Sequence, residues 1–427
     1  MRILYVSHYF PPEMGAPAGR VAGLARQWVA AGHTVDVLTG FPHHPTGVIH
    51  LEYRRAFRRG YLREDFFGAS VHRCWIFPAA NRGKILRSLN YASFMASAFG
   101  NGALRLARPD VVVATSPQLL CAAAGALLAQ RFAAPLVMEV RDLWPESLVA
   151  VGAWQGRSML VRGLESLARR LYARAQHIVT VTEAQRSAIV GGGIPAGQVT
   201  VIPNGVDDDF LRAAGQFPHP DGGPFIATYI GTLGMAHHLE TLLEAAALLR
   251  DDPGFRFRLV GEGARRSRLE ARARELGLRN VEFIGERPRG EVPRWIAESH
   301  ACLVLLRKSE VFRTVVPSKM FEVMAVGRPI VLGVEGEARA LLERAGAGIS
   351  VPPENPAALS EALRDLRSDP DRRRTLGENG RRFVQSEFQR APLAARYLEL
   401  LSALALQPQT EQAPEVCAEA DPVSEPR

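Results

Sequence analysis

Residues 111–130 read VVVATSPQLLCAAAGALLAQ and contain no charged side chain over twenty positions. A run of this length can span a membrane as one helix, yet its interior favours a different structure. The β-branched residues 111–113 predict a strand, TSPQ at 115–118 predicts a turn, and the Ala-rich residues 119–130 predict a buried helix. A second strand is predicted at Leu136–Val140. The stretch therefore indicates a strand–helix–strand unit of a parallel sheet.

The same alternation extends along most of the chain. In the first half, strands are predicted at 3–7, 34–39, 71–77, 110–115, 136–140, 177–182 and 199–202, with a helix at 17–31. In the second half, strands are predicted at 225–230, 256–260, 281–284, 302–306, 330–334 and 348–351. Strands separated by helices predict the α/β class, with two doubly wound parallel sheets. Because such sheets bind ligands at the carboxyl ends of their strands, function is expected on those loops.

The length of 427 residues exceeds what one hydrophobic core supports, so two domains are expected. The pattern lapses at 204–224 into Asn-Gly, Asp, Gly and Pro residues, which are typical of turns. We predict an N-terminal Rossmann-like domain at 1–203, a linker at 204–224 and a C-terminal Rossmann-like domain at 225–380. A helix at 381–406 is predicted to return to the first domain, and the Pro- and Glu-rich tail at 407–427 to be disordered.

The net charge of +8 favours an anionic partner. Residues 51–108 contain eleven Lys or Arg residues against three acidic ones, so much of the excess lies there. Residues 53–63 and 83–91 mix basic with aromatic and aliphatic side chains, a combination that suits the anionic inner surface of a membrane. A solvated basic face is an equally open explanation. Nucleic acid is not expected as a partner, because no RNA-binding motif accompanies the segment.

The N-terminus and the cysteines predict a cytoplasmic protein, either free or peripheral on the inner face of the plasma membrane. Residues 3–6 begin a strand directly, without the basic and apolar segments of a signal peptide, so export is not expected. The cysteines at 74, 121, 302 and 417 are far apart and lack CxxC spacing. Neither a disulfide framework nor a zinc site is therefore expected.

Two segments have the chemistry of a phosphate site. Residues 7–20 follow the first strand, and small residues such as Gly15 would let a phosphate approach free backbone N–H groups. An ordinary turn explains them equally well, and the absence of GxGxxG argues against an NAD enzyme. In the second segment Pro317 opens a helix, which places the N–H groups of 318–320 at its positive end, while Lys319 and Glu322 share one face. A diphosphate and a ribose would fit there, although a structural Lys–Glu pair is the simpler explanation.

Seven short motifs together resemble the family-4 retaining glycosyltransferases of the GT-B fold, in particular the bacterial polysaccharide branch that adds amino sugars to lipid-linked precursors. In chain order they are YFPPE at 9–13 with Gly15, GHTV at 32–35, RDLWPES at 141–147, IPNGVD at 202–207, GTLG at 231–234, VGEG at 260–263 and PSKMFEVMAVGRP at 317–329. Their order and spacing, which cover nearly all of the chain before the tail, carry the resemblance.

The resemblance implies two Rossmann-like domains that face each other across a cleft. It also implies transfer of a sugar, an N-acetylated amino sugar in this branch, from a nucleotide diphosphate sugar to a polyprenyl-diphosphate-linked glycan. Uridine is the base by analogy, O-antigen or colanic-acid synthesis is the setting, and retention without a metal or other cofactor is expected. The implied catalytic residues are Lys319, Glu322, Arg141 and Asp142. The implied donor contacts are Gly15, Gly231, Thr232, Gly234, Gly261, Glu262, Gly263, Thr314 and Ser318, and the implied acceptor contacts are His8, Glu13 and Glu183.

The chain departs from the family pattern at two places. Thr314 stands where the family usually has the first of two glutamates separated by seven residues, and Glu322 is the second. Thr232 and the pair His237–His238 stand where many members have Arg and Lys, so diphosphate neutralisation is expected to fall on Lys319 and on backbone N–H groups.

Three further possibilities concern the reaction and a metal. The run Asp207–Asp209 resembles a metal motif but is predicted to cap a helix, since further oxygen ligands are missing. A nucleotide-sugar epimerase or hydrolase of the same fold remains an alternative. So does a non-catalytic nucleotide-sugar-binding module.

Overall fold

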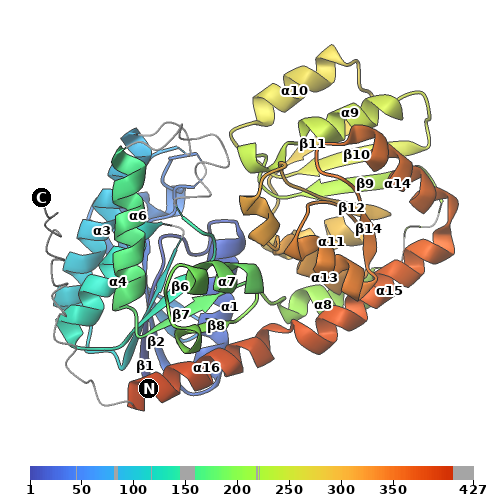
Figure 1. The fold of residues 1–427 in the computed structure, drawn as a ribbon. Coiled ribbons are helices and arrows are strands. Elements are labelled where there is room, and N and C mark those ends of the chain that lie inside the picture. The colour runs from blue at the N-terminus through green and yellow to red at the C-terminus, as the bar shows by residue number, and fades with distance from the viewer. Residues whose placement is uncertain are drawn as a thin grey trace, which may run out of the picture.

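The computed structural model describes residues 1–44, 46–80, 85–116, 118–144, 159–217, 220 and 222–406, and it contains two α/β domains side by side (Figure 1). The predicted strand and helix within 111–130 are confirmed as β5 (Val111–Thr115) and α4 (Leu119–Phe132), while residue 117 of the predicted turn lies outside the described residues. None of the helices in the described ranges is both long and apolar enough to cross a membrane. The predicted disordered tail at 407–427 lies outside the described residues.

The N-terminal domain is built on an eight-stranded sheet of order β3-β4-β2-β1-β5-β6-β7-β8. Its other strands are β1 (Arg2–Val6), β2 (Thr34–Gly40), β3 (Tyr61–Phe66), β4 (Ala69–Cys74), β6 (Leu136–Val140), β7 (His177–Thr180) and β8 (Val199–Val201). All neighbours pair in parallel except β3, which is antiparallel to β4. The predicted parallel sheet is confirmed, and the antiparallel edge strand β3 is an element that was not predicted. The sequence hides β3 because an edge strand tolerates charged residues such as Arg63, Glu64 and Asp65.

Helices cover both faces of this sheet. One face packs on α3 (Ile85–Arg105), α4 and α6 (Met159–Arg174), and the other on α1 (Ala16–Ala30). The remaining helical segments of this domain are η1 (Leu51–Tyr53), α2 (Arg54–Phe57), α7 (Glu183–Gly191) and η2 (Ala196–Gln198). Buried residues of β5 alternate between the two cores, Val112 with one and Val113 with the other.

The C-terminal domain has a six-stranded, fully parallel sheet of order β11-β10-β9-β12-β13-β14, as predicted. The strands are β9 (Phe225–Ile230), β10 (Phe255–Val260), β11 (Val281–Gly285), β12 (Ala301–Leu305), β13 (Ile330–Gly333) and β14 (Gly348–Ser350). The helices are η3 (Met235–His237), α9 (Glu240–Leu248), α10 (Arg266–Glu275), η4 (Arg289–Glu291), α11 (Val292–Ala297), η5 (Val311–Thr314), α12 (Lys319–Val326), α13 (Glu337–Ala345) and α14 (Pro356–Ser368).

The first connection between the domains differs from the predicted linker at 204–224. Residues Asp208–Gln216 form helix α8, whose Phe210 and Ala213 are buried in the same core as Met320 of α12. A helix forms here because these apolar side chains share one face that the second domain covers. The irregular stretch is therefore shorter than predicted.

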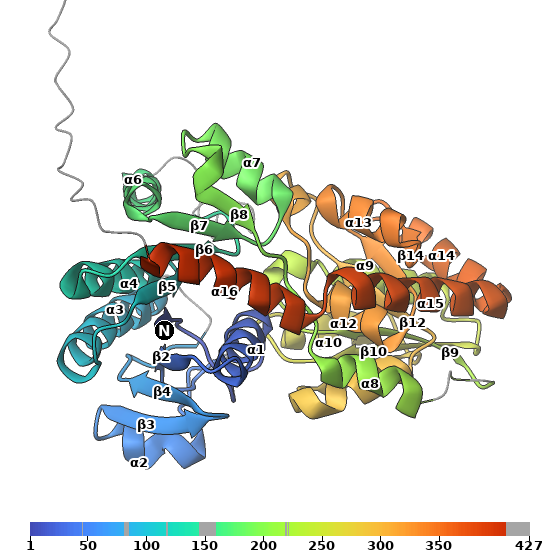
Figure 2. The same ribbon diagram turned by 90° about the horizontal axis from the view of Figure 1, so that it is seen from below.

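The second connection is formed by α15 (Pro370–Glu387) and α16 (Arg390–Leu406), which run along the bottom of both domains in Figure 1 and across the front of the view in Figure 2. The predicted single helix at 381–406 breaks at 388–389. There the N–H of Val206 donates to Phe388 O at 2.9 Å, and the N–H of Arg390 donates to Val206 O at 3.0 Å. The predicted return to the first domain is confirmed, since Tyr397 is buried in its core and the Trp28 indole N–H donates to Ala394 O at 3.0 Å.

Candidate active site

Lys319 begins α12 with its ammonium group buried and unpartnered. Nζ lies 4.0 Å from the centre of the Tyr229 ring and has no hydrogen-bond partner among the described residues. Burial lowers the pKa of Lys319 to about 7, and the nearby charge of Glu322 opposes that effect. A buried cation without a partner is costly. The site is therefore suited to an anionic ligand that would supply the missing partner.

Glycines allow the loops after β9 and β10 to lie against this ammonium group. Gly231 has φ +141°, and a Cβ at that position would come within 2.6 Å of Lys319 Nζ. Gly261 has φ +143°, and a Cβ there would collide with the carbonyl oxygen of Gly231. Similarly, a Cβ at Gly263 would collide with the backbone of Leu233, whose N–H donates to Glu262 O at 2.8 Å. The predicted donor loops therefore pack backbone against backbone beside Lys319.

The other predicted donor residues have local partners. Thr232 O accepts the Tyr229 hydroxyl at 2.8 Å, and Gly234 precedes η3. The carboxylate of Glu262 forms an ion pair with Arg266. Ser318 stands at the N-cap of α12, while the N–H of Met320 donates to Pro317 O at 3.0 Å. Met320 therefore does not offer the free N–H that the sequence predicted, because the first turn closes on itself.

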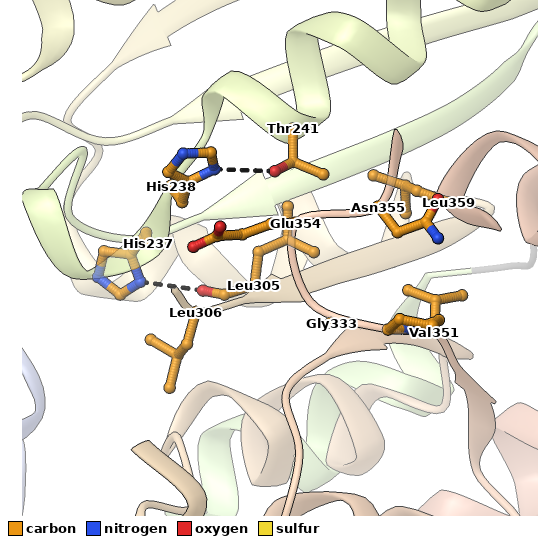
Figure 3. Close-up of a pocket in the computed structure, with 11 residues that line it drawn as sticks. His237, His238, Thr241, Leu305, Leu306, Gly333, Val351, Glu354, Asn355 and Leu359 are labelled. Carbon is orange, nitrogen blue, oxygen red and sulfur yellow. Dashed lines mark hydrogen bonds between the residues drawn. The ribbon is translucent and has the colours of Figure 1, made fainter. Parts of the chain in front are cut away.

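His237 and His238 do not replace the missing cations. His237 Nδ1 lies 3.3 Å from Leu305 O, and burial together with the charge of Lys319 lowers the pKa of His237 to about 3. The ring is therefore neutral at pH 7. His238 Nδ1 bonds with Thr241 Oγ1 at 3.0 Å. Both rings line a small hollow at the ends of β12, β13 and β14, together with Glu354 and Asn355 (Figure 3). Lys319 is therefore the cation that lies against Gly231.

Glu322 lies one helical turn beyond Lys319 and pairs with an arginine that the sequence did not single out. Its Oε1 is 3.1 Å from Arg289 Nη1, and Arg289 Nη2 is 3.0 Å from Asp207 Oδ2. The local sequence RPR at 287–289 resembles other basic surface runs, so only proximity in space reveals Arg289.

Asp207 has a different role from the one predicted for the acidic run. It occupies the N-cap position of α8 but makes no side-chain cap, because its carboxylate pairs with Arg289 and Arg390. The capping prediction is therefore wrong for its side chain. Asp208 and Asp209 lie in the first turn of α8. No group of three or more candidate metal ligands occurs within the described part of the chain.

In the N-terminal domain, the loop after β1 carries two buried groups with polar atoms that lack a partner among the described residues. Glu13 Oε1 accepts the backbone N–H groups of His43 and His44 at 3.0 Å each, while Oε2 has no partner among the described residues. Burial raises the pKa of Glu13 to about 7. His8 is buried between aromatic rings, its two ring nitrogens lack described partners, and burial holds its pKa well below the usual value.

Further groups of this kind follow β5 and β6. Arg141 and Asp142 come directly after β6, and Arg141 Nε is buried without a described partner. Burial lowers the pKa of Arg141 and raises that of Asp142 to about 6. Ser116 Oγ and Gln118 Oε1 are also buried and have no partner in the described part of the chain, and the sequence analysis missed both although they closely follow a predicted strand. Buried polar groups are normally hydrogen-bonded, so this edge of the sheet has the features of a ligand site.

Glu183 and Thr314 both take part in the contact between the domains, each with a different partner. The carboxylate of Glu337 accepts the N–H groups of Glu183 at 3.0 Å and Ala184 at 2.7 Å. Thr182 Oγ1 donates to Thr314 O at 2.9 Å, while the Thr314 hydroxyl donates to Val311 O. Both predicted residues thus contribute backbone groups to the interface.

Two protein-family models match the chain. The model described as "Glycosyl transferase 4-like domain" matches residues 15–205, and "Glycosyl transferases group 1" matches residues 214–383. The chain belongs to the family-4 glycosyltransferases. The resemblance drawn from the seven motifs is thereby confirmed, as is the class of enzyme, a transferase of hexosyl groups.

A curated relative resembles this glycosyltransferase in sequence, and solved structures of other proteins resemble it in fold. It is 29% identical over 405 residues to "Putative colanic acid biosynthesis glycosyl transferase WcaI" of Escherichia coli, covering 91% of this chain and 97% of that one. Sucrose-phosphate synthase of Thermosynechococcus elongatus superposes with a TM-score of 0.70 at 21% identity, over 94% of this chain and 98% of that one. Anabaena HepE in complex with UDP-glucose superposes with a TM-score of 0.66 at 18% identity, over 94% and 100%. The GT-B fold is confirmed by these neighbours.

Proposed function

We propose that this glycosyltransferase transfers an N-acetylated amino sugar from a UDP-sugar to a lipid-linked glycan during cell-surface polysaccharide synthesis. Transfer retains the anomeric configuration and needs no metal ion. The relationship to the colanic-acid protein WcaI supports a role in polysaccharide synthesis. The choice of uridine has its support in HepE, which shares the fold and was solved with UDP and with UDP-glucose.

The unpartnered ammonium group of Lys319 is the observation that carries the proposal. A nucleotide diphosphate would place its phosphates beside Nζ and against the backbone of the glycine loops, where no Cβ intervenes. The carboxylate of Glu322, one turn along the same helix, would accept hydrogen bonds from the ribose hydroxyls. The positive end of α12 adds to the attraction for the phosphates.

In the transfer step, the bond between the anomeric carbon and the diphosphate breaks, and its electron pair leaves with the diphosphate. A new bond forms from the acceptor oxygen to the same face of that carbon. The acceptor's hydroxyl proton passes to an oxygen of the leaving diphosphate. The work of the protein is to stabilise the charge that develops on the leaving group, a task that falls on Lys319 and the start of α12.

The acceptor would enter from the N-terminal domain. His8, Glu13, Gln118 and Arg141 follow β1, β5 and β6 and offer polar atoms without a partner among the described residues. Sugar hydroxyls both donate and accept hydrogen bonds, so they can satisfy a neutral imidazole, a carboxyl group and an amide together.

A membrane-facing surface would bring a lipid-linked acceptor to this edge. The exposed arginines of α2 and its flank, Arg54, Arg55, Arg58 and Arg59, lie in the same domain as exposed apolar side chains at the start of α3. Ile85 is 77% exposed, and Leu86 and Leu89 are each about half exposed. Arginines combined with exposed aliphatic residues favour an anionic leaflet.

The proposal is tested by measuring UDP release from a panel of UDP-sugars, with and without a polyprenyl-diphosphate-linked glycan. We expect acceptor-dependent release and a product that keeps the anomeric configuration of the donor. Release without an acceptor would indicate a hydrolase, and isomerisation of the donor sugar would indicate an epimerase. Binding of UDP-sugars without any turnover would indicate a non-catalytic module.

A further inference from the structure

Five charged side chains of alternating sign lead from the start of α12 to the connections between the domains. In order they are Lys319, Glu322, Arg289, Asp207 and Arg390, and we refer to them as the charge row. Arg289 joins Glu322 and Asp207 through ion pairs of 3.1 Å and 3.0 Å. Asp207 Oδ1 in turn lies 2.9 Å from Arg390 Nε. The row thus reaches from the helix of Lys319 to the chain segment that begins α16.

Arg289 is the central member of the row because its two terminal nitrogens bind different carboxylates. A guanidinium group is planar, so the directions of its two ion pairs are fixed relative to each other. Its flat face also lies over the ring of Phe210, 5.1 Å from the ring centre, which restricts its position. A movement of Glu322 is therefore transmitted to Asp207. A lysine would keep the charge but lose this two-sided geometry.

The far end of the charge row lies where the domains join. Asp207 and Arg390 adjoin Val206, which forms backbone hydrogen bonds with both Phe388 and Arg390. Two glycines one turn apart on α1 allow that helix of the first domain to rest on the row. A Cβ at Gly23 would come within 2.8 Å of Arg390 Nε and 2.9 Å of Asp207 Oδ1, and one at Gly19 within 3.4 Å of Arg289 Cζ. The row therefore contacts both domains and both connections.

We propose that Arg289 is a positioning residue that couples donor binding to the relative orientation of the two domains. The proposal rests on the donor site proposed above. Ribose hydroxyls at Glu322 would compete with Arg289 for the carboxylate, and a diphosphate at Lys319 would add negative charge at the near end of the row. Both changes alter how strongly Arg289 is held by Glu322 relative to Asp207. Asp207 is paired with Arg390 at the connections and lies against α1. Occupation of the donor site would therefore change the relative orientation of the two domains.

The coupling is measured by fluorescence energy transfer between labels on α6 and α10, at cysteines introduced by Arg170→Cys and Arg272→Cys, two exposed positions. Cys417→Ser removes the native cysteine that lies outside the described residues. The native thiols of Cys74, Cys121 and Cys302 are buried, and burial raises the pKa of each to about 12, so labelling is selective. UDP is titrated into the wild-type background and into Arg289→Met, Arg289→Lys and Asp207→Asn. Arg294→Met is the matched control, since it removes a surface pair with Glu298 on neighbouring α11.

UDP should change the transfer efficiency in the wild type and in Arg294→Met. In Arg289→Met and Arg289→Lys, UDP should still bind, within about tenfold of the wild-type affinity because Lys319 remains, but the change in efficiency should disappear. Asp207→Asn should lose the change with a smaller effect on affinity, because it leaves Glu322 paired. If Arg289→Met does not fold, Arg289→Lys and Asp207→Asn decide the question.

The contrary outcomes separate this inference from the proposed function. A wild-type response in both Arg289→Lys and Asp207→Asn would overturn the coupling. So would a wild-type protein that binds UDP without any change in transfer efficiency, although the donor site would then stand. Failure of the wild type to bind UDP at all would remove the donor site and this inference with it.

Discussion

The carboxylate of Glu337 in the C-terminal domain accepts the backbone N–H of Glu183 in the N-terminal domain at 3.0 Å, and that of Ala184 at 2.7 Å. Glu337 lies on the first turn of α13 in one domain, and Glu183 begins α7 in the other. The bonds cap a helix N-terminus, where a negative charge is favoured by the helix dipole. Since the two partners belong to different domains, this contact exists only while the domains are close.

Removal of this contact should reduce turnover more than donor affinity. Glu337→Ala leaves two N–H groups of α7 without their acceptor, a loss of about 1–3 kcal/mol from the closed arrangement. We expect kcat to fall by about tenfold while the Kd of UDP, measured by calorimetry, stays within about twofold. Glu343→Ala, which removes a surface pair with Arg339 on the same helix, is the control. Equal losses in both variants would contradict a role for the contact in closure.

Lys319→Ala should abolish most activity while the fold stays intact. It deletes the cation beside the leaving diphosphate, so kcat should fall by about 10²–10³-fold. Because the ammonium group is buried without a described partner, its removal should leave the melting temperature unchanged or raise it. Glu322→Ala should mainly weaken donor binding. Wild-type turnover in both variants at low and saturating donor would show that residues 317–329 are structural.

Donor affinity should fall as the pH rises above about 7. Burial lowers the pKa of Lys319 to about 7 in the free protein, so its ammonium group loses its proton through neutral pH. The diphosphate favours the charged form, and binding therefore takes up a proton where Lys319 is neutral. The lowered pKa of Lys319 also determines how the stability of the folded protein depends on pH. The free protein gains stability as pH rises from about 7 toward the ordinary lysine value, because the unfolded chain binds the extra proton in that window.

Calorimetry with UDP-glucose between pH 6 and pH 9 tests this dependence, since its phosphates do not titrate in that range. Affinity should fall by at most about tenfold per pH unit at the alkaline end, the limit for one proton. Lys319→Arg should give a flat profile, because a guanidinium group keeps its charge. A wild-type profile as flat as that of the arginine variant would exclude the linkage.

Chelation should leave activity unchanged. Asp207 is engaged by Arg289 and Arg390, which leaves the acidic run without its first carboxylate for a metal. Turnover is compared before and after treatment with EDTA, then after addition of Mg²⁺ or Mn²⁺. Strict dependence on the added metal would falsify the metal-independent mechanism.

The basic and apolar surface of the N-terminal domain should bind anionic liposomes in a salt-dependent manner. Exposed charges are screened beyond roughly 8 Å at physiological ionic strength, so added salt should weaken binding. Reversal of charge at Arg54, Arg55, Arg58 and Arg59 should lower it further, without changing UDP affinity in the other domain. The membrane role is wrong if the protein does not bind anionic liposomes at low salt and turns over a lipid-free acceptor as fast as a lipid-linked one.

Periodicity predicted the α/β class and most strands because buried strands of parallel sheets are continuous apolar runs. Strand β3 was missed, since an edge strand needs no such run. Helix α8 was assigned to the linker because its Asp and Gly residues carry the composition of a turn, while its burial depends on a distant surface.

The candidate site likewise contains residues that the sequence predicted and residues that only the structure reveals. Lys319 and Glu322 follow from spacing on one helix, whereas Arg289 is separated from Glu322 by 33 positions and meets it only in three dimensions. Likewise, nothing local indicates that Asp207 prefers two arginines to the helix it precedes. Sequence patterns identify groups on one element, but pairing between elements depends on the packing of the whole chain.

The double connection between the domains also limits how this enzyme can be recombined. Helix α16 comes last in sequence but completes the core of the first domain, where Leu393, Tyr397 and Leu401 are buried. A chimera that exchanges the donor-binding half must therefore be cut twice, near Val206 and near Gln389, and must retain α16 from the parent that supplies α1. A single cut at the first connection would pair α1 with a foreign α16 and leave Trp28 against a surface it did not evolve with.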